Sequence, residues 1–149
     1  MSTPQLVAVV PSEDFLQSLS MADRRITLHR VFYDLFAQSF PAYAPRIPVT
    51  LIFCGGAGEY QGQVQLTDPA EALTALADFS FHASTLFVQH VVLAGELRMP
   101  GSYHLAVWLE GRLVATVPLT VAALQPQGKP DQRNTGDQPQ YAGALEGGW

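Results

Sequence analysis

Cysteine occurs only once in this 149-residue chain, as Cys54. A single cysteine excludes an intrachain disulfide. No cation or helix start lies near it in the sequence to lower its thiol pKa, so we predict a small residue in or beside a strand. A chain of this length buries enough surface to fold as one domain without a disulfide or a metal.

Basic residues are also few, with eight Lys and Arg against 13 Asp and Glu and a net charge of −5. Lysine occurs once, at Lys129, and only Arg24 and Arg25 are adjacent. Nucleic-acid binding depends on clustered basic side chains that displace counterions from phosphates. We therefore expect no nucleic-acid partner.

Long apolar runs are missing too. The run at residues 6–10 is too short for the core of a signal peptide, and no basic region precedes it. No stretch approaches the roughly 20 apolar residues that span a bilayer. We therefore expect no membrane partner and a cytoplasmic location.

Motifs for metal binding, nucleophilic catalysis and phosphate binding are likewise missing. The histidines fall on separate predicted strands without metal-ligand spacing, at His29, His82, His90 and His104. There is no G-x-S-x-G elbow, and the only glycine cluster, residues 55–58, lacks the helix and lysine of a phosphate loop. We predict no metal site, no cofactor and no enzymatic activity, and an enzyme is the least favoured hypothesis.

The clearest pattern that is present is an alternation of period two. Large apolar side chains at positions 103, 105, 107 and 109 alternate with His104, Ala106, Trp108 and Glu110. A similar alternation over residues 113–120 follows the turn at 110–112, and the two segments predict a β-hairpin. Pro118 has no N–H to donate, so we expect the last strand to lie at an edge or to carry a bulge there.

Six further segments are predicted strands, namely residues 6–10, 26–35, 47–53, 60–67, 73–82 and 86–97. Seven or eight strands without a long helical pattern predict an all-β, antiparallel two-sheet sandwich, with residues 37–46 crossing between the sheets. Residues 69–78 contain good helix formers, but their alternation continues through Phe81 and favours a strand. Residues 12–20 are compatible with a helical turn that has Ser12 as its N-cap.

Composition changes near residue 125. Residues 1–124 are rich in Val, Leu, Phe and Ala and are predicted to form the domain. Residues 125–149 are rich in Pro, Gln, Gly and Asp and predict a flexible polar tail, because they hold few side chains to bury. Its large apolar residues are Tyr141, Leu145 and Trp149. A free end is favoured over one that docks on the domain or on a partner.

Residues 25–42, RITLHRVFYDLFAQSFPA, resemble the second strand and loop of a group of uncharacterised bacterial immunoglobulin-like domain proteins. The likeness continues in the turn at residues 100–103 and the hairpin turn at 110–112, and covers residues 5–122. The resemblance implies an immunoglobulin-like sandwich but no activity and no site residues. Tyr103 after Pro100-Gly101 is also similar to the corner tyrosine of such domains, whose hydroxyl bonds back to the main chain.

Aromatic side chains supply the candidate binding residues. Phe32 and Tyr33 belong to an aromatic cluster at residues 32–43, and Trp108 with His104 is expected to face outward if Tyr103 faces the core. The first hypothesis is a non-enzymatic interaction module that binds a protein partner or a second copy of itself. The alternative is a module that binds carbohydrate or another ligand, with Trp108 as a stacking platform. It is also open whether Trp108 is covered by a neighbouring loop.

Overall fold

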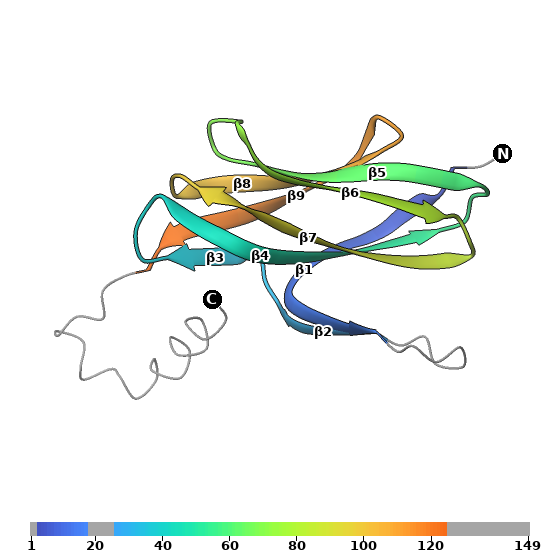
Figure 1. The fold of residues 1–149 in the computed structure, drawn as a ribbon, viewed down its shortest axis with the longest axis horizontal. Helices are drawn as coiled ribbons and strands as arrows, with labels where there is room; N and C mark the ends of the chain where they lie inside the picture. Colours follow the sequence, from blue (N-terminus) through green and yellow to red (C-terminus); the bar gives the residue numbers. More distant parts are fainter. Residues whose placement is uncertain (1–2, 18–25, 125–149) are drawn as a thin grey trace.

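The structure, a computed structural model, describes residues 3–17 and 26–124, which form two facing β-sheets (Figure 1). The nine strands are β1 (Gln5–Gln17), β2 (Ile26–Val31), β3 (Asp34–Ala37), β4 (Ala42–Cys54), β5 (Glu59–Thr67), β6 (Leu73–His82), β7 (Leu86–Leu97), β8 (Gly101–Leu109) and β9 (Arg112–Ala123). This confirms the predicted all-β sandwich. The predicted tail, residues 125–149, lies outside the described residues, and no helix within them is long and apolar enough to cross a membrane.

The order of the strands is that of an immunoglobulin-like sandwich. One sheet has the order β2-β1-β4-β7 and the other β3-β9-β8-β5-β6, so the chain changes sheets after β2, after β3, after β4, after β6 and after β7. Every pairing among the described strands is antiparallel except that of β3 with β9, which is parallel. This differs from the wholly antiparallel expectation because β3 joins the sheet from a distant part of the chain, without a hairpin to fix its direction.

The N-terminal part differs from the prediction in two ways. Residues 12–17 continue β1 instead of forming a helical turn, because β1 leaves β4 after Pro11 and pairs with β2 from Ser12 onward. Residues 18–20 of that predicted turn are outside the described ranges. The predicted strand 26–35 is divided into β2 and β3, since the chain bends at Phe32, whose N–H donates to the carbonyl of Pro11 at 3.1 Å, and crosses to the other sheet.

Residues 73–82 form strand β6, as predicted. The predicted crossing at residues 37–46 is shorter, because only residues 38–41 cross from β3 to β4, and residues 42–46 already belong to β4, where residues 42–44 pair with β7. Pro118 lies opposite His104 of β8, whereas β3 begins its pairing with β9 only at Thr120. Pro118 therefore occupies a stretch of β9 whose other side no described strand pairs with, as its missing N–H requires.

The core lies between the sheets and follows the period-two pattern. Its largest fully buried side chains include Tyr103, Phe53, Leu35, Ile47 and Leu51, each at 0 or 1% exposure. Toward one end the packing is aromatic. The rings of Phe53 and Phe81 stack with centroids 4.6 Å apart, and those of Phe81 and Phe87 with centroids 5.1 Å apart. Such offset ring pairs add stability beyond the apolar area they bury.

Tyr103 makes the predicted corner. Its hydroxyl donates to the carbonyl oxygen of Met99 at 2.7 Å, and the Met99 N–H approaches the same hydroxyl at 3.4 Å. The side chain is fully buried at the start of β8, and this burial raises the pKa of the phenol. The bond ties the β7–β8 turn to the strand that enters the centre of the sheet.

We expect Tyr103→Phe to lower the free energy of unfolding by about 1–3 kcal/mol, because the Met99 carbonyl loses its partner while the ring still fills the core. Urea denaturation measures the change. Tyr43→Phe is the control, since Tyr43 is 68% exposed, and should stay within about 0.5 kcal/mol of the wild type. Equal effects of the two substitutions would contradict a structural role for the Tyr103 hydroxyl.

The second half of β1 and β2 form an arm, residues 12–17 and 26–31, which folds over the outer face of the four-stranded sheet (Figure 1). Phe15 stacks on His90 of β7 with ring centroids 4.0 Å apart, and His90 Nδ1 lies 2.9 Å from the hydroxyl of Thr50 on β4. Arg46 pairs with Asp14 at 2.8 Å. The arm is thus held on this outer face by the Phe15–His90 ring stack and the Asp14–Arg46 ion pair.

Burial lowers the pKa of His90 below its ordinary value of 6.5. The unfolded chain therefore binds a proton at this residue before the folded chain does as pH falls, and the free energy of unfolding should fall from about pH 7 to about pH 5. Urea denaturation over this range tests the slope. A His90→Gln variant should show a shallower slope than the wild type, whereas His82→Gln, at an exposed position, should keep it.

The neighbouring Asp14 does not interfere in this range. The N–H of Phe15 and the guanidinium of Arg46 lower the pKa of Asp14 below 3.8, so its contribution is lost only at more acid pH. An unchanged slope in His90→Gln would show that His90 does not couple the arm to pH.

Candidate functional site on the outer face of the five-stranded sheet

Strand β8 has one buried and one outer side. Tyr103, Leu105, Val107 and Leu109 are buried, whereas His104 is exposed and Trp108 half-buried on the opposite side. Trp108 and His104 therefore face outward, as the alternation predicts. Since β8 is an inner strand of the sheet, Trp108 lies between Gln63 of β5 and Leu113 of β9.

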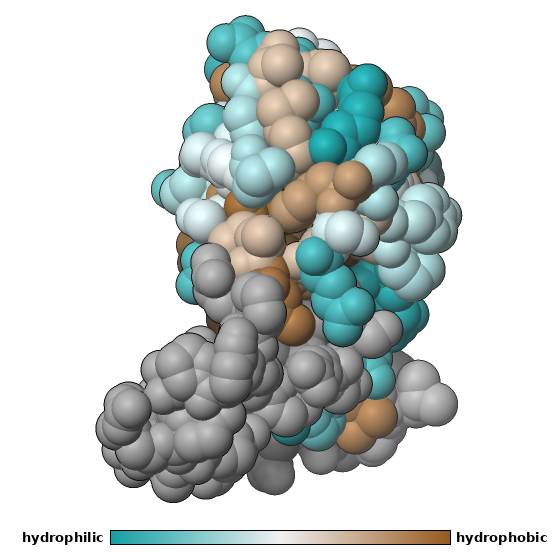
Figure 2. Space-filling view, turned by 90° about the vertical axis from the view of Figure 1, so that its left-hand side faces the viewer, coloured by the Kyte–Doolittle hydropathy of each residue, from teal (hydrophilic) through white to brown (hydrophobic). Residues whose placement is uncertain are grey.

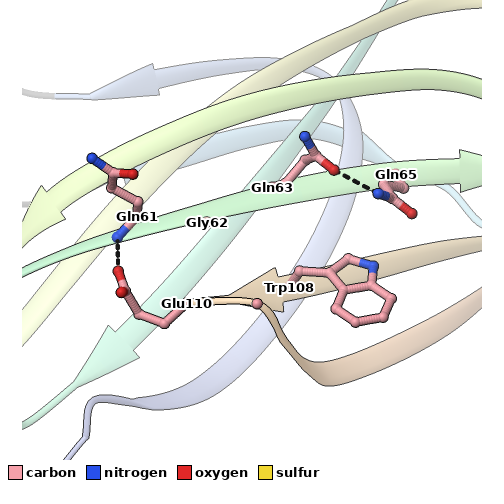
Figure 3. Close-up of a pocket in the computed structure, with 7 residues that line it drawn as sticks. Gln61, Gly62, Gln63, Gln65, Trp108 and Glu110 are labelled. Atoms are coloured by element: carbon pink, nitrogen blue, oxygen red, sulfur yellow. Dashed lines mark hydrogen bonds between the residues drawn. The ribbon is translucent and has the colours of Figure 1, made fainter.

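The indole of Trp108 is only partly accessible. Its Nε1 is buried and has no hydrogen-bond partner within the described ranges. The register of β8 and β9 shifts between Val107 and Trp108, so a β-bulge lies at this point. Figure 3 shows the ring beside β5, with the nitrogen on the edge that faces Gln65. The sequence left open whether Trp108 is exposed or covered. In the structure its side chain is half-buried.

Three glutamines project from β5 next to this indole. Gln61, Gln63 and Gln65 share the outer face because they alternate with inward positions, of which Val64 and Leu66 are fully buried. The Nε2 of Gln65 donates to Oε1 of Gln63 at 2.5 Å (Figure 3). Gln63 donates in turn from Nε2 to Oδ1 of Asp78 on β6 at 2.8 Å. The amides of Gln65 and Gln63 therefore form a connected row that ends on the Asp78 carboxylate.

The hairpin between β8 and β9 bounds the other end of this row. Its two turn residues, Glu110 and Gly111, have φ values of 51° and 79°, which suits the tight turn that matches strand twist. The Glu110 N–H donates to the Gln61 carbonyl at 2.9 Å, and the Gln61 N–H donates to Oε2 of Glu110 at 2.6 Å. Both contacts hold the turn against the start of β5 (Figure 3).

These residues surround an open hollow of about 500 Å³, which we call the glutamine groove. It is lined by Gln61, Gly62, Gln63, Gln65, Trp108, Glu110 and Gly111. A second hollow of about 500 Å³ shares Gln61 and Gly62 with it and extends toward Asp78 and Ser80 of β6. Both hollows are within the roughly 300–1,000 Å³ range of small-molecule sites.

The absence of a side chain at Gly62 allows the Phe79 ring to pack directly against the backbone of β5. A Cβ on Gly62 would lie 2.3 Å from Cζ of Phe79 and 2.6 Å from the carbonyl oxygen of Trp108. The Phe79 ring, which is buried, therefore occupies the space beneath β5 where a side chain would stand. Gly62 therefore lines the groove on one side of β5 and contacts Phe79 of the core on the other.

The four candidate residues from the sequence do not form one cluster. Trp108 lines the groove, and His104 lies on the same face about 13 Å along β8, four residues away. Phe32 packs against the core, and Tyr33, 45% exposed, lies in the bend between β2 and β3. The glutamines were not identified as site residues, although their spacing at alternate positions of a half-exposed strand was the available signal.

Chemically, the groove offers amides, one carboxylate and an indole. Within the described ranges, no group of three His, Cys, Asp or Glu is placed to hold a metal ion. The close pair formed by the Thr50 hydroxyl and His90 lies on the other sheet, with Thr50 fully buried and Phe15 stacked on the imidazole.

No protein-family model and no characterised protein matches the sequence. Among solved structures, a glycosyl hydrolase family 2 member from Bacteroides cellulosilyticus DSM 14838 aligns with a TM-score of 0.43 at 7% identity, over 61% of this chain and 16% of its own length. A β-glucosidase from Listeria innocua aligns with a TM-score of 0.42 at 15% identity, over 82% of this chain and 17% of its own length. The chain therefore spans less than a fifth of the length of each of these enzymes, and the likeness says nothing of a site.

We expect Gly62→Ala to lower the free energy of unfolding by about 1–3 kcal/mol, because the added methyl group overpacks the contact with Phe79. Thermal or urea denaturation measures it. Gly58→Ala separates this effect from backbone strain, since a Cβ there meets nothing within 4 Å and only its φ of +93° is unfavourable. A Gly62→Ala variant as stable as the wild type would contradict the close approach beneath the groove.

Proposed function

We propose that the chain is a non-enzymatic binding module and that its partner occupies the glutamine groove. The observation that carries this proposal is the concave row of hydrogen-bonding amides beside a half-buried indole, on an outer sheet face. A few convergent polar groups in a hollow are the usual features of a ligand site. The site contains binding groups but no nucleophile with an adjacent base, which favours binding over catalysis.

The groove is also held in place before any partner arrives. Glu110 is fixed by two contacts with Gln61, and Gln63 is fixed by Gln65 and Asp78. Side chains that are already ordered lose less conformational entropy when a partner binds. This preorganisation supports a binding role for the row rather than that of an ordinary solvated strand face.

A protein partner or a second copy of the chain, the first hypothesis from the sequence, is the less favoured occupant of this groove. Centres of protein interfaces are enriched in aromatic residues, Met and Arg, and the groove offers only Trp108 of these.

At the end of the molecule where β7 turns into β8, apolar and polar side chains are interspersed over the described residues (Figure 2). A cytoplasmic location stays a prediction from the sequence.

The test compares two double variants. Gln63→Ala with Gln65→Ala removes the amide row, and Gln5→Ala with Gln38→Ala removes two exposed glutamines elsewhere. A glycan array and quantitative pull-down with crosslinking are run with both variants and the wild type. We expect at least one bound species to be lost at least tenfold by the groove variant and kept by the control. Identical binding profiles for all three proteins would exclude the groove as the binding site.

A further inference from the structure

We infer that the glutamine groove takes a neutral, hydroxyl-rich ligand of the glycan class. This inference rests on the proposed binding role of the groove and adds the chemistry of the ligand. It follows from three properties of the lining residues: the direction of the hydrogen bonds along the row, the sign of the charge, and the state of the Trp108 indole.

The carboxylate of Asp78 sets the direction of the amide row. An ionised carboxylate only accepts hydrogen bonds, so Gln63 must turn its NH₂ group toward Asp78, as it does at 2.8 Å. The carbonyl oxygen of Gln63 is then directed to Gln65, which donates to it at 2.5 Å. Each amide keeps a further N–H, and the Oε1 of Gln65 makes no bond within the row. The groove therefore presents donors and acceptors side by side.

A hydroxyl group is the ligand group that matches such a surface, because it donates one hydrogen bond and accepts others at the same atom. A peptide that binds by strand addition would instead need an unpaired strand edge, and β5 is paired on both sides, with β6 and β8. The row therefore fits closely spaced hydroxyls better than an extended peptide.

Charge excludes an anionic ligand. The residues that line the groove include no Lys, Arg or His, and Glu110 contributes a carboxylate. Asp78 lies in the adjoining hollow with Ser80. A phosphate, sulfate or uronate group would meet like charge without a compensating cation, whereas a neutral sugar would not.

Trp108 supplies the apolar component. An aromatic ring packs against the C–H face of a sugar while its hydroxyls reach the polar rim, and an indole is a large, rigid surface for this purpose. Its Nε1 is buried without a partner within the described residues, and leaving a buried donor unpaired costs about 1–3 kcal/mol. A small shift of the Gln65 amide or of the ring would bring this donor to a ligand hydroxyl at the edge seen in Figure 3.

The experiment uses Trp108 as its own reporter. The chain contains two tryptophans, Trp108 and Trp149, so full-length Trp149→Phe leaves the groove indole as the sole emitter. This protein is titrated with laminarin, glycogen, xylan and galactomannan as neutral probes and with polygalacturonate as the anionic probe. We expect a saturable change in Trp108 emission with at least one neutral glycan and none with polygalacturonate.

The same titrations are repeated in the two double glutamine variants on the Trp149→Phe background. The groove variant should bind the responding glycan at least tenfold more weakly, and the Gln5→Ala/Gln38→Ala control should be unchanged. No response to any neutral probe, an equal response in the groove variant, or a stronger response to polygalacturonate would each overturn the inference. If a protein is captured in a groove-dependent manner while no glycan responds, the binding role stands and only the ligand class is wrong.

Discussion

The pairing of β5 with β8 is the constraint on which both the core and the groove depend. It runs antiparallel from Gly62 opposite Leu109 to Thr67 opposite His104. Because side chains alternate along a strand, the register that places Val64 and Val107 in the core also places Gln63 beside Trp108 outside. A slip of one residue would exchange the faces and bury the amides, so the hydrophobic pattern that fixes the core also fixes the site.

The sequence was most informative where structure is local. The β8–β9 hairpin and the unpaired side of β9 at Pro118 follow from neighbouring residues and were predicted. The hydroxyl contact of Tyr103 was predicted from the resemblance to immunoglobulin-like domains. The continuation of β1 past Pro11 was not, because it depends on pairing with β2, and propensity alone allowed a helical turn there. The parallel pairing of β3 with β9 joins segments more than 80 residues apart in register, at Asp34 and Thr120, and no local pattern reports it.

The site was predicted only in part for a similar reason. Alternation was enough to turn Trp108 and His104 outward, but it could not show that Gln63 stands opposite Trp108, which requires the register of a strand some 45 residues away. Aromatic residues drew attention to Phe32, which packs against the core. Glutamines on a half-exposed strand are ordinary in sequence, and only their mutual hydrogen bonds and the carboxylate of Asp78 set this row apart.

The two outer faces of the sandwich differ in how they meet solvent. On the four-stranded sheet the arm lies over the face, and Phe15 stacks on the imidazole of His90, which contacts the hydroxyl of Thr50. On the five-stranded sheet no described strand covers the row between Trp108 and Asp78, yet the amides of Gln63 and Gln65 are already bonded to each other. An open polar face normally leaves such groups to water, with free rotation. Here the Asp78 carboxylate fixes the direction of the Gln63 amide and, through it, that of Gln65, so a ligand would meet an ordered set of donors and acceptors.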